Sequence, residues 1–372
     1  MAATEATDMS EQALPVAMIG VGGFGGQTLS ALRRCRHVRL VGLSDRNAKA
    51  AELAGQEAGA PAFADNRSLL AETRPAAVFL AAPPSAAAEV VLACAERGIH
   101  VWKEAPLARN LDEGVAMVRP MERAGLRLAV GTQRRFSSGY RRAWELRDEL
   151  GEVFLARAHY LFNWGPQLGW RADKASAGGG ALLELGYHPI DLLLWVLGLP
   201  EEVYGLATQA AGPAGQTAKL MYDTDDTAAA VMRFAGGAIA SVVTTRSSGP
   251  VSEQLCLHGR RGSLAACLES CILRDADGNT LDSTEAQSSP LDLYVRQVDA
   301  FARAVMGNNR HYECSGLENL LAQATIEAIY LSDRTLHPES PERLLSSHGM
   351  SKEDCLRYRP PAESAPPLDT KG

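Results

Sequence analysis

The chain has 372 residues, of which 46% are hydrophobic and 22% are charged, and its formal net charge at pH 7 is −7. Because a chain of this length has more residues than usually fold around one hydrophobic core, we predict two domains. The acidic balance excludes an extensive basic surface, so we expect neither nucleic acid nor an anionic membrane as a partner.

The N-terminal residues and the cysteines both indicate a cytoplasmic protein. Residues 1–14 are small and polar, which predicts a disordered N-terminus. They are acidic, and they lack the positively charged start and the apolar stretch of a signal peptide. The longest apolar run, residues 192–199, is shorter than the roughly 20 residues of a membrane span. The seven cysteines contain no CxxC pair, as is typical of reduced thiols, and we predict no metal site at the closest pair, Cys267 and Cys271.

Residues 15–135 show the alternation of strands and helices that is typical of a doubly wound α/β domain. Parallel strands covered on both faces are predicted by uniformly apolar runs at 16–20, 38–43, 77–81, 99–102 and 126–130. Helices are predicted at 85–97 and 110–124, because each has helical spacing and is followed by a glycine suited to a left-handed turn. We therefore predict a Rossmann-type parallel sheet as the N-terminal domain.

A glycine-rich turn follows the first predicted strand, with the sequence GVGGFG from Gly20 to Gly25, including Gly23 and Phe24. In such a turn Gly20 permits the tight bend, Gly22 lets the backbone approach a pyrophosphate, and Gly25 allows the next helix to pack closely. The N-terminus of that helix supplies free N–H groups for the phosphates. The pattern predicts a dinucleotide-binding site.

An acidic residue stands where NAD is distinguished from NADP. Asp45 ends the second strand and lies 45 − 25 = 20 residues beyond Gly25, where a carboxylate accepts hydrogen bonds from the adenosine ribose. Arg46, beside it, would stack on adenine or meet the extra phosphate of NADP. We predict NAD as the cofactor, with NADP as the alternative.

From residue 136 to 350 the pattern changes to that of an α+β domain. A mainly antiparallel sheet is predicted by alternating segments separated by glycine-containing turns, at 152–162, 226–235, 238–246 and 252–258. Helices at 180–197 and 290–307 are expected to cover one face of this sheet, and a third at 316–333 to pack toward the first domain. Residues 351–372, rich in proline, serine and charge, predict a flexible tail.

One helical segment carries a polar stripe on an otherwise apolar surface. Glu184, His188 and Asp191 stand at positions i, i+4 and i+7 of the predicted helix. A carboxylate near a histidine suits general acid/base chemistry near neutral pH, and a hydrogen-bonded core cluster is the alternative interpretation. Pro189 removes a helical N–H and would kink the helix or restart it at His188.

These segments, taken in order over about residues 15–335, resemble the Gfo/Idh/MocA family, which includes glucose-fructose oxidoreductase and inositol dehydrogenase. The resemblance rests on the glycine turn, the helix led by three glycines, and the sequences APPS at 82–85, GTQRRF at 131–136 and GWR at 169–171. It implies a large open-faced second sheet and a homodimer or homotetramer.

The resemblance also implies roles for individual residues. The family's helix reads approximately GGGxLxDxGxHxxD, so Glu184 stands at the aspartate position and His188 at the histidine position. His188 would then exchange the proton of a substrate hydroxyl while nicotinamide takes or gives the hydride, with Glu184 orienting the imidazole. Gln133, Ala82 and Pro83 would lie next to the cofactor.

The chain departs from the family at its usual Glu-Lys-Pro sequence. Here the residues are Lys103, Glu104, Ala105 and Pro106, so alanine occupies the position of the catalytic lysine. Glu104 keeps the acidic position near the nicotinamide ribose. In an extended strand Lys103 would point to the same side as Ala105, about 6.6 Å away, and so is a candidate substitute for the lysine or a structural residue.

The function implied by the resemblance is that of an NAD(P)-dependent dehydrogenase or reductase acting on a polyhydroxylated substrate, such as a sugar, sugar derivative or cyclitol. Aromatic faces suit sugar rings, and we expect the pocket to be lined by Trp164, Trp170, Arg171, Tyr187 and Asp191. Two alternatives remain: a lyase or glycosidase that recycles tightly bound NAD, and an NAD-binding sensor or assembly protein without turnover.

Overall fold

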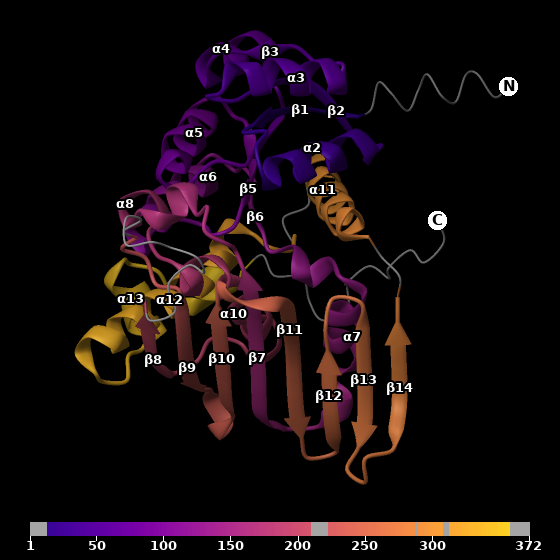
Figure 1. The fold of residues 1–372 in the computed structure, drawn as a ribbon, viewed down its shortest axis with the longest axis vertical. Helices are drawn as coiled ribbons and strands as arrows, with labels where there is room; N and C mark the ends of the chain where they lie inside the picture. The colour runs from indigo at the N-terminus through magenta and orange to yellow at the C-terminus, as the bar shows by residue number, and fades with distance from the viewer. Residues whose placement is uncertain (1–12, 210–221, 287–288, 308–311, 358–372) are drawn as a thin grey trace, which may run out of the picture.

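The computed structural model describes residues 13–209, 222–286, 289–307 and 312–357. Two sheets dominate these residues, one of six strands and one of eight. In Figure 1 the six-stranded sheet and its helices occupy the top of the view, and the eight-stranded sheet lies below them. Of the predicted disordered ends, 1–14 and 351–372, residues 1–12 and 358–372 lie outside the described residues, whereas Leu14 already belongs to a strand.

The first sheet is wholly parallel, with the strand order β3-β2-β1-β4-β5-β6. Its strands are β1 (Leu14–Ile19), β2 (Val38–Ser44), β3 (Ala62–Phe63), β4 (Ala77–Leu80), β5 (His100–Glu104) and β6 (Leu128–Gly131). Each of the five apolar runs forms a strand here, which confirms the predicted parallel sheet. The strand order reverses between β1 and β4, and a ligand binds at this point in doubly wound sheets.

The helices between these strands are α2 (Phe24–Arg34), α3 (Ala48–Ala58), α4 (Asn66–Thr73), α5 (Pro84–Glu96) and α6 (Leu111–Arg123). The glycines predicted to end α5 and α6 have left-handed backbones, with φ of 72° at Gly98 and 68° at Gly125. Strand β3 was not predicted, because only two of its residues pair.

The second sheet has the order β14-β13-β12-β11-β7-β10-β9-β8, and its pairs are antiparallel apart from β7 with β10. Its strands are β7 (Val153–Asn163), β8 (Glu202–Thr208), β9 (Thr227–Arg233), β10 (Ile239–Thr245), β11 (Ser247–Gly259), β12 (Gly262–Ala266), β13 (Ser270–Asp275) and β14 (Thr280–Glu285). The four predicted strands and the mainly antiparallel pairing are confirmed.

One face of this sheet contacts helices, and the other presents apolar side chains to solvent. Helices α7 (Ser138–Leu146), α10 (Tyr187–Leu197) and α12 (Gly316–Thr335) pack on the first face, and α12 also contacts α6 of the N-terminal domain. Pairing and burial along β8, β9 and β10 define an uncovered face with five large apolar side chains, namely Tyr204, Leu206, Val231, Ile239 and Val243.

Helix α11 (Pro290–Met306) corrects one prediction, because it packs on α2 and not on the second sheet (Figure 1). Tyr294, Val298 and Phe301 lie in one core cluster with residues of β1 and α2. The spacing of apolar residues located the helix and its buried side, but it carries no information on which domain covers that side.

The helix predicted at 180–197 is two helices. After α8 (Lys174–Ala177), α9 (Ala181–Glu184) ends before Gly186, α10 begins at Tyr187, and the chain bends by 53° between Lys174–Glu184 and Tyr187–Leu197. Pro189 is the third residue of α10, in the turn whose N–H groups need no helical partner, so the break precedes His188. Among the described residues no single helix is long and apolar enough to cross a membrane; this bent pair meets that test only when both parts are combined.

Short helices complete the described chain: η1 (Gln133–Phe136), η2 (Arg147–Leu150), η3 (Gly169–Ala172), η4 (Ala235–Gly237), α13 (Pro341–Ser347) and α14 (Lys352–Leu356). Helix α14 lies where the sequence predicts the start of the flexible tail. A capping box from Ser351 to Asp354 begins this helix, and Cys355 is buried, so ordered structure extends past residue 351.

Candidate active site

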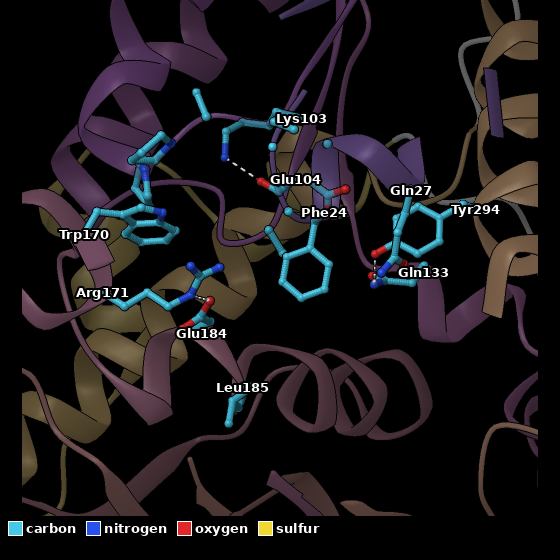
Figure 2. Close-up of a pocket in the computed structure, with 18 of the residues that line it drawn as sticks. Phe24, Gln27, Lys103, Glu104, Gln133, Trp170, Arg171, Glu184, Leu185 and Tyr294 are labelled. Atoms are coloured by element: carbon cyan, nitrogen blue, oxygen red, sulfur yellow. Dashed lines mark hydrogen bonds and ion pairs between the residues drawn. The ribbon is translucent and has the colours of Figure 1, made fainter. Parts of the chain in front are cut away.

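A cleft of about 560 Å³ lies between the two domains, at the carboxyl ends of β1, β4 and β5. Its other walls come from β7, η1, η3, α9, α10 and α11. In Figure 2, Trp170, Arg171 and Glu184 lie on one side of Phe24, and Gln133 and Tyr294 lie on the other. The cleft therefore joins the expected cofactor end to the residues expected to contact the substrate.

The glycine turn forms one end of this cleft, and its glycines are needed for different reasons. A Cβ on Gly20, whose φ is 86°, would lie 2.1 Å from the Ala81 carbonyl oxygen, and one on Gly25 would lie 2.3 Å from that of Gly20. At Gly22 a Cβ would meet nothing within 4 Å. The protein's own packing thus requires Gly20 and Gly25, whereas Gly22 leaves open space of the kind that a pyrophosphate needs.

Asp45 is held at the mouth of the cleft by backbone N–H groups. Val21 and Asn47 each donate to one of its carboxylate oxygens at 2.8 Å. Arg46 beside it is exposed, and both residues line the cleft. The open glycine and the anchored carboxylate together suit the adenosine and pyrophosphate parts of a dinucleotide.

Lys103 is buried and also lines the cleft, although it belongs to strand β5. Its Nζ donates to the carbonyl oxygen of Glu104 at 2.7 Å (Figure 2) and closely to that of Pro106. Burial lowers the pKa of Lys103 to about 7. Because this value lies near neutrality, the amine can exchange a proton under physiological conditions.

Glu104, next along the strand, is partly buried. Its Oε1 accepts a hydrogen bond of 2.9 Å from the Thr28 hydroxyl, and burial raises its pKa to about 7. Ala105 follows at the cleft wall and supplies no polar group. The polar chemistry of this wall therefore rests with Lys103 and Glu104.

His188 faces the cleft from the first turn of α10. Its Nδ1 is buried and makes no hydrogen bond to the described residues, while its ring centre lies 6.1 Å from that of Tyr160. Burial, and next the guanidinium of Arg134, hold the pKa of His188 well below its usual value. The imidazole is consequently neutral at pH 7 and has a nitrogen able to accept a proton.

Glu184 bonds to Arg171, whereas the sequence analysis expected it to orient His188. Arg171 Nε donates to Glu184 Oε1 at 2.5 Å, and the guanidinium lies 4.0 Å from the ring centre of Trp164 and 4.3 Å from that of Trp170. Burial raises the pKa of Glu184, and Arg171 opposes this shift. The break after α9 explains the difference, because it ends the helical spacing that would pair residues 184 and 188.

Phe24 connects this group with the glycine turn. Its ring meets that of Trp164 edge to face, with the centres 5.9 Å apart, and the Arg171 guanidinium lies 6.0 Å from its centre. The expected cofactor end and the expected substrate end of the cleft are therefore in contact.

Several residues of the cleft were not predicted, and Arg134 is the most prominent. It donates to Glu253 Oε2 at 3.0 and 3.2 Å and lies 4.8 Å from the ring centre of Tyr160. Its place directly after Gln133 was a usable signal. Nothing in the sequence, however, indicated the pairing with Glu253, which lies 119 residues away.

Tyr294 was missed for a related reason, since it lies on α11. Its hydroxyl oxygen is 3.3 Å from Nε2 of Gln133, so α11 forms part of the cleft wall. Its role depends on the packing of α11 against the first domain, which the sequence did not reveal.

Two residues expected to line the substrate pocket lie outside the cleft. Asp191 accepts hydrogen bonds of 2.5 and 2.8 Å from Arg135, which also donates to Glu318 at 2.6 Å, and all three side chains are buried. The hydroxyl of Tyr187 donates to Asn319 Oδ1 at 2.9 Å. These positions of α10 face α12, so the expectation for both residues is corrected. The other predicted site residues line the cleft. Gly20 is the exception, because it packs against the backbone of Ala81 within the turn.

Comparison with known proteins gives matches over both domains. Residues 14–132 match the model of an oxidoreductase family with an NAD-binding Rossmann fold, and residues 140–265 match the GFO/IDH/MocA C-terminal domain. The chain is 26% identical to D-xylose 1-dehydrogenase (NADP(+)) 2 of Haloferax volcanii, covering 86% of this chain and 97% of the relative. It is 24% identical to D-glucoside 3-dehydrogenase of Escherichia coli, over 88% of this chain and 97% of that protein.

The fold is also that of a solved structure. Levoglucosan dehydrogenase in complex with NADH and levoglucosan superposes with a TM-score of 0.79 at 23% identity, covering 88% of this chain and 99% of the other.

Proposed function

The chain belongs to the Gfo/Idh/MocA family of NAD-binding oxidoreductases, and we propose that it transfers a hydride between nicotinamide and an uncharged sugar or cyclitol, with His188 as the acid/base. One observation carries this proposal: a single cleft runs from the open glycine at position 22 to the neutral imidazole of His188. The hydride can then leave a substrate carbon, and the proton can leave the hydroxyl oxygen on that carbon, within one enclosed space.

The cofactor is held largely by the first domain. We assign its pyrophosphate to residues 22–25 and the N-terminus of α2, its adenosine ribose to Asp45, and its nicotinamide ribose to the region of Glu104 and Gln133. When bound, the nicotinamide supplies the hydride chemistry. Asp45 would repel the additional phosphate of NADP, which favours NAD.

The protein's contribution to the reaction is proton transfer and positioning. In the oxidative direction His188 takes the proton of the substrate hydroxyl, because its imidazole is neutral and lines the cleft. Lys103 compensates for Ala105: its Nζ is fixed by two backbone carbonyls at the cleft wall and exchanges a proton near pH 7. Glu184 orients Arg171, not the imidazole.

The charge pairing in the substrate part favours an uncharged ligand. Arg171 is neutralised by Glu184 at 2.5 Å, and Arg134 by Glu253 at 3.0 Å. A carboxylate or phosphate would have to compete with these carboxylates for the same guanidinium groups. The rings of Tyr160, Trp164 and Trp170 instead offer apolar surface against which a sugar ring stacks.

The uncovered face of the second sheet supports the proposed homo-oligomer. Tyr204, Leu206, Val231, Ile239 and Val243 form a contiguous apolar surface on adjacent strands. A surface of this kind is typical of protein interfaces, and a second copy of the chain is the proposed partner.

A thermal-shift comparison of NAD and NADP, followed by a substrate panel, tests the function. A ligand at about 100 times its dissociation constant adds about 2.7 kcal/mol to the unfolding free energy, so the preferred cofactor should raise Tm clearly. Steady NADH formation with a neutral sugar or cyclitol is the expected result. Product without net NADH would favour the lyase or glycosidase alternative, and tight NAD binding without any turnover would favour the sensor.

A further inference from the structure

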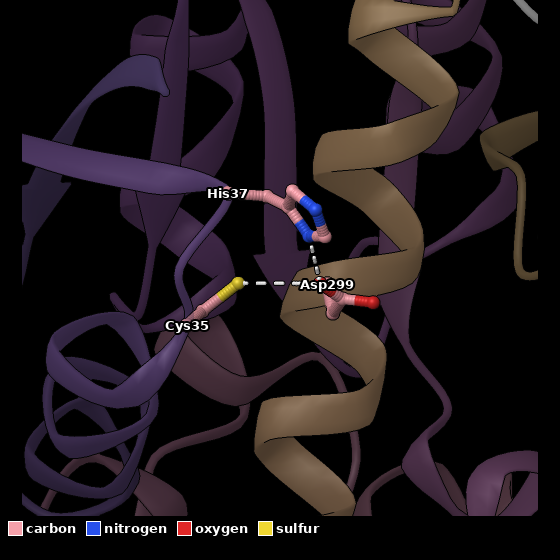
Figure 3. Close-up of side chains that lie close together, drawn as sticks. All are labelled: Cys35, His37 and Asp299. Carbon is pink, nitrogen blue, oxygen red and sulfur yellow. Dashed lines mark hydrogen bonds and ion pairs between the residues drawn. The ribbon is translucent and has the colours of Figure 1, made fainter. Parts of the chain in front are cut away.

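A second cluster of chemically active side chains lies away from the cleft, where the turn between α2 and β2 meets α11 (Figure 3). Cys35 Sγ lies 3.6 Å from Asp299 Oδ1, and His37 Nδ1 contacts the same oxygen closely. One donor atom from each of the three side chains lies within 4.8 Å of the other two. A thiol, an imidazole and a carboxylate therefore converge on one point.

The backbone positions of these three residues are well fixed. Cys35 caps the C-terminus of α2 and donates its N–H to the Ala31 carbonyl oxygen, and His37 follows within the same turn. Asp299 follows Val298, which is fully buried where α11 packs on α2. Because both helices are held by the same hydrophobic core, the donor groups are brought together before any ligand binds.

We propose that Cys35, His37 and Asp299 bind a divalent transition-metal ion of the zinc type. Sulfur, nitrogen and oxygen donors in this combination suit zinc better than magnesium or calcium, which prefer oxygen alone. Zinc bonds of about 2.3 Å to sulfur and about 2.0 Å to oxygen at a tetrahedral angle would separate the two ligand atoms by about 3.5 Å. The observed separation of Sγ and Oδ1 is 3.6 Å.

The carboxylate of Asp299 is already oriented by a neighbouring residue, whereas His37 has to move its ring away from that carboxylate to make room for an ion. Arg303 Nη2 bonds to Asp299 Oδ2 at 2.5 Å, which orients the carboxylate and leaves Oδ1 facing the other two donors. The His37 and Asp299 side chains keep 23% and 21% of their surface exposed, so solvent reaches the point and water completes the coordination.

Binding involves exchange of a proton and no redox change. The Cys35 thiol releases its proton to solvent as the sulfur–metal bond forms, and His37 Nδ1 exchanges its contact with Asp299 for a bond to the ion. The bound ion would link α2 to α11, five residues beyond Tyr294 in the cleft wall. The site would thus stabilise this wall without taking part in hydride transfer.

Titration of the full-length protein with Co²⁺ tests the site, since a thiolate ligand produces a charge-transfer absorption band. We expect one Co²⁺ per chain with such a band, displaced by Zn²⁺. Cys35→Ser should abolish the band, and Asp299→Asn, which keeps the shape of the helix surface, should weaken binding at least tenfold. His337→Gln, an exposed histidine elsewhere, is the matched control and should bind as the wild type does.

The wild-type protein alone can overturn the proposal. Absence of a charge-transfer band at saturating Co²⁺ would show that the three side chains form a hydrogen-bonded cluster only. Binding that persists unchanged in a folded Asp299→Asn variant would place the ion elsewhere. Neither readout depends on turnover, so this test and that of the enzymatic function fail independently.

Discussion

The two sheets contribute to the cleft in different ways. The parallel sheet supplies mainly backbone: the turn at residues 20–25, the loop after β4, and N–H groups that hold Asp45. The second domain supplies paired and aromatic side chains from segments far apart in the sequence, including Tyr160, Arg171 and Glu253. The half of the cleft formed by the first domain therefore depends on the local backbone conformation at its glycines, and the half formed by the second domain depends on tertiary packing.

This difference predicts which substitutions damage binding and which damage chemistry. Changes in the first half should alter cofactor affinity, because backbone clearance admits or excludes the pyrophosphate. Changes in the second half should alter turnover, because the proposed acid/base His188 lies there; Lys103 is the exception, since it lies on β5 of the first half and is also proposed to exchange a proton.

The largest effect is expected from His188→Ala. Loss of the proton acceptor should lower turnover by about 10²- to 10⁴-fold, while the dissociation constant of NAD stays close to that of the wild type. Tyr187→Phe is the matched control, because this neighbouring residue faces Asn319 outside the cleft and its variant should keep its activity. Steady-state kinetics and cofactor titration measure both quantities, and undiminished turnover of His188→Ala would remove the imidazole from the mechanism.

A smaller loss, about 100-fold in turnover, is expected from Lys103→Met. In the oxidative direction wild-type activity should rise with pH through about 7, where the buried amine loses its proton, and the variant should lose this dependence. A pH series of kcat/KM makes the measurement. Unchanged kinetics would identify Lys103 as a structural residue.

Lys103 also makes a prediction for stability. Its pKa is lowered from 10.5 to about 7, so between these values the unfolded chain binds more protons than the folded protein. The unfolding free energy of the wild type should therefore increase as the pH rises across that window. In Lys103→Met this increase should be absent. Urea denaturation at several pH values above 7 compares the two proteins.

Gly22→Ala should weaken NAD binding about tenfold, which is about 1.4 kcal/mol, without lowering the Tm of the unliganded protein. A methyl group at this position meets no protein atom within 4 Å and would occupy the space assigned to the pyrophosphate. Gly25→Ala gives the contrast, because its Cβ would lie 2.3 Å from a backbone oxygen and should destabilise the protein itself. Equal NAD affinity in Gly22→Ala and the wild type would place the cofactor elsewhere.

The smallest effect on activity is expected from Val231→Glu on the uncovered face of the second sheet. A charge at this 49% exposed position should dissociate the proposed oligomer and change the unfolding free energy by less than about 0.5 kcal/mol. Light scattering reports the mass of the particle. An unchanged mass would mean that copies of the chain associate through another surface.

The sequence predicted the regions in which local rules decide. Uniformly apolar strands, glycines at helix ends and the turn at 20–25 were all located, because each depends on residues close together in the chain. Domain boundaries and residue roles stay predictions. The remaining differences arise where distant residues decide: α11 has an amphipathic pattern that suits either domain, and Asp191 is drawn into an ion pair with Arg135.

The break before His188 has the same origin. Apolar periodicity runs through residues 180–197, but Asp225 accepts hydrogen bonds of 2.8 Å from the N–H groups of Gly180 and Leu182 and so sets the direction of α9. Because Asp225 lies more than 40 residues away in the chain, this cap cannot be predicted from the local sequence. The same redirection separates Glu184 from His188.

The contact between Phe24 and Trp164 bears on the order in which ligands arrive. Phe24 is the first residue of α2, beside the turn to which we assign the pyrophosphate, and its ring also contacts Trp164 at the proposed substrate end of the cleft. A dinucleotide bound at the glycine turn would restrict the Phe24 ring, so a substrate that binds next would meet a fixed cleft wall. We therefore expect ordered binding, in which the dinucleotide enters before the substrate.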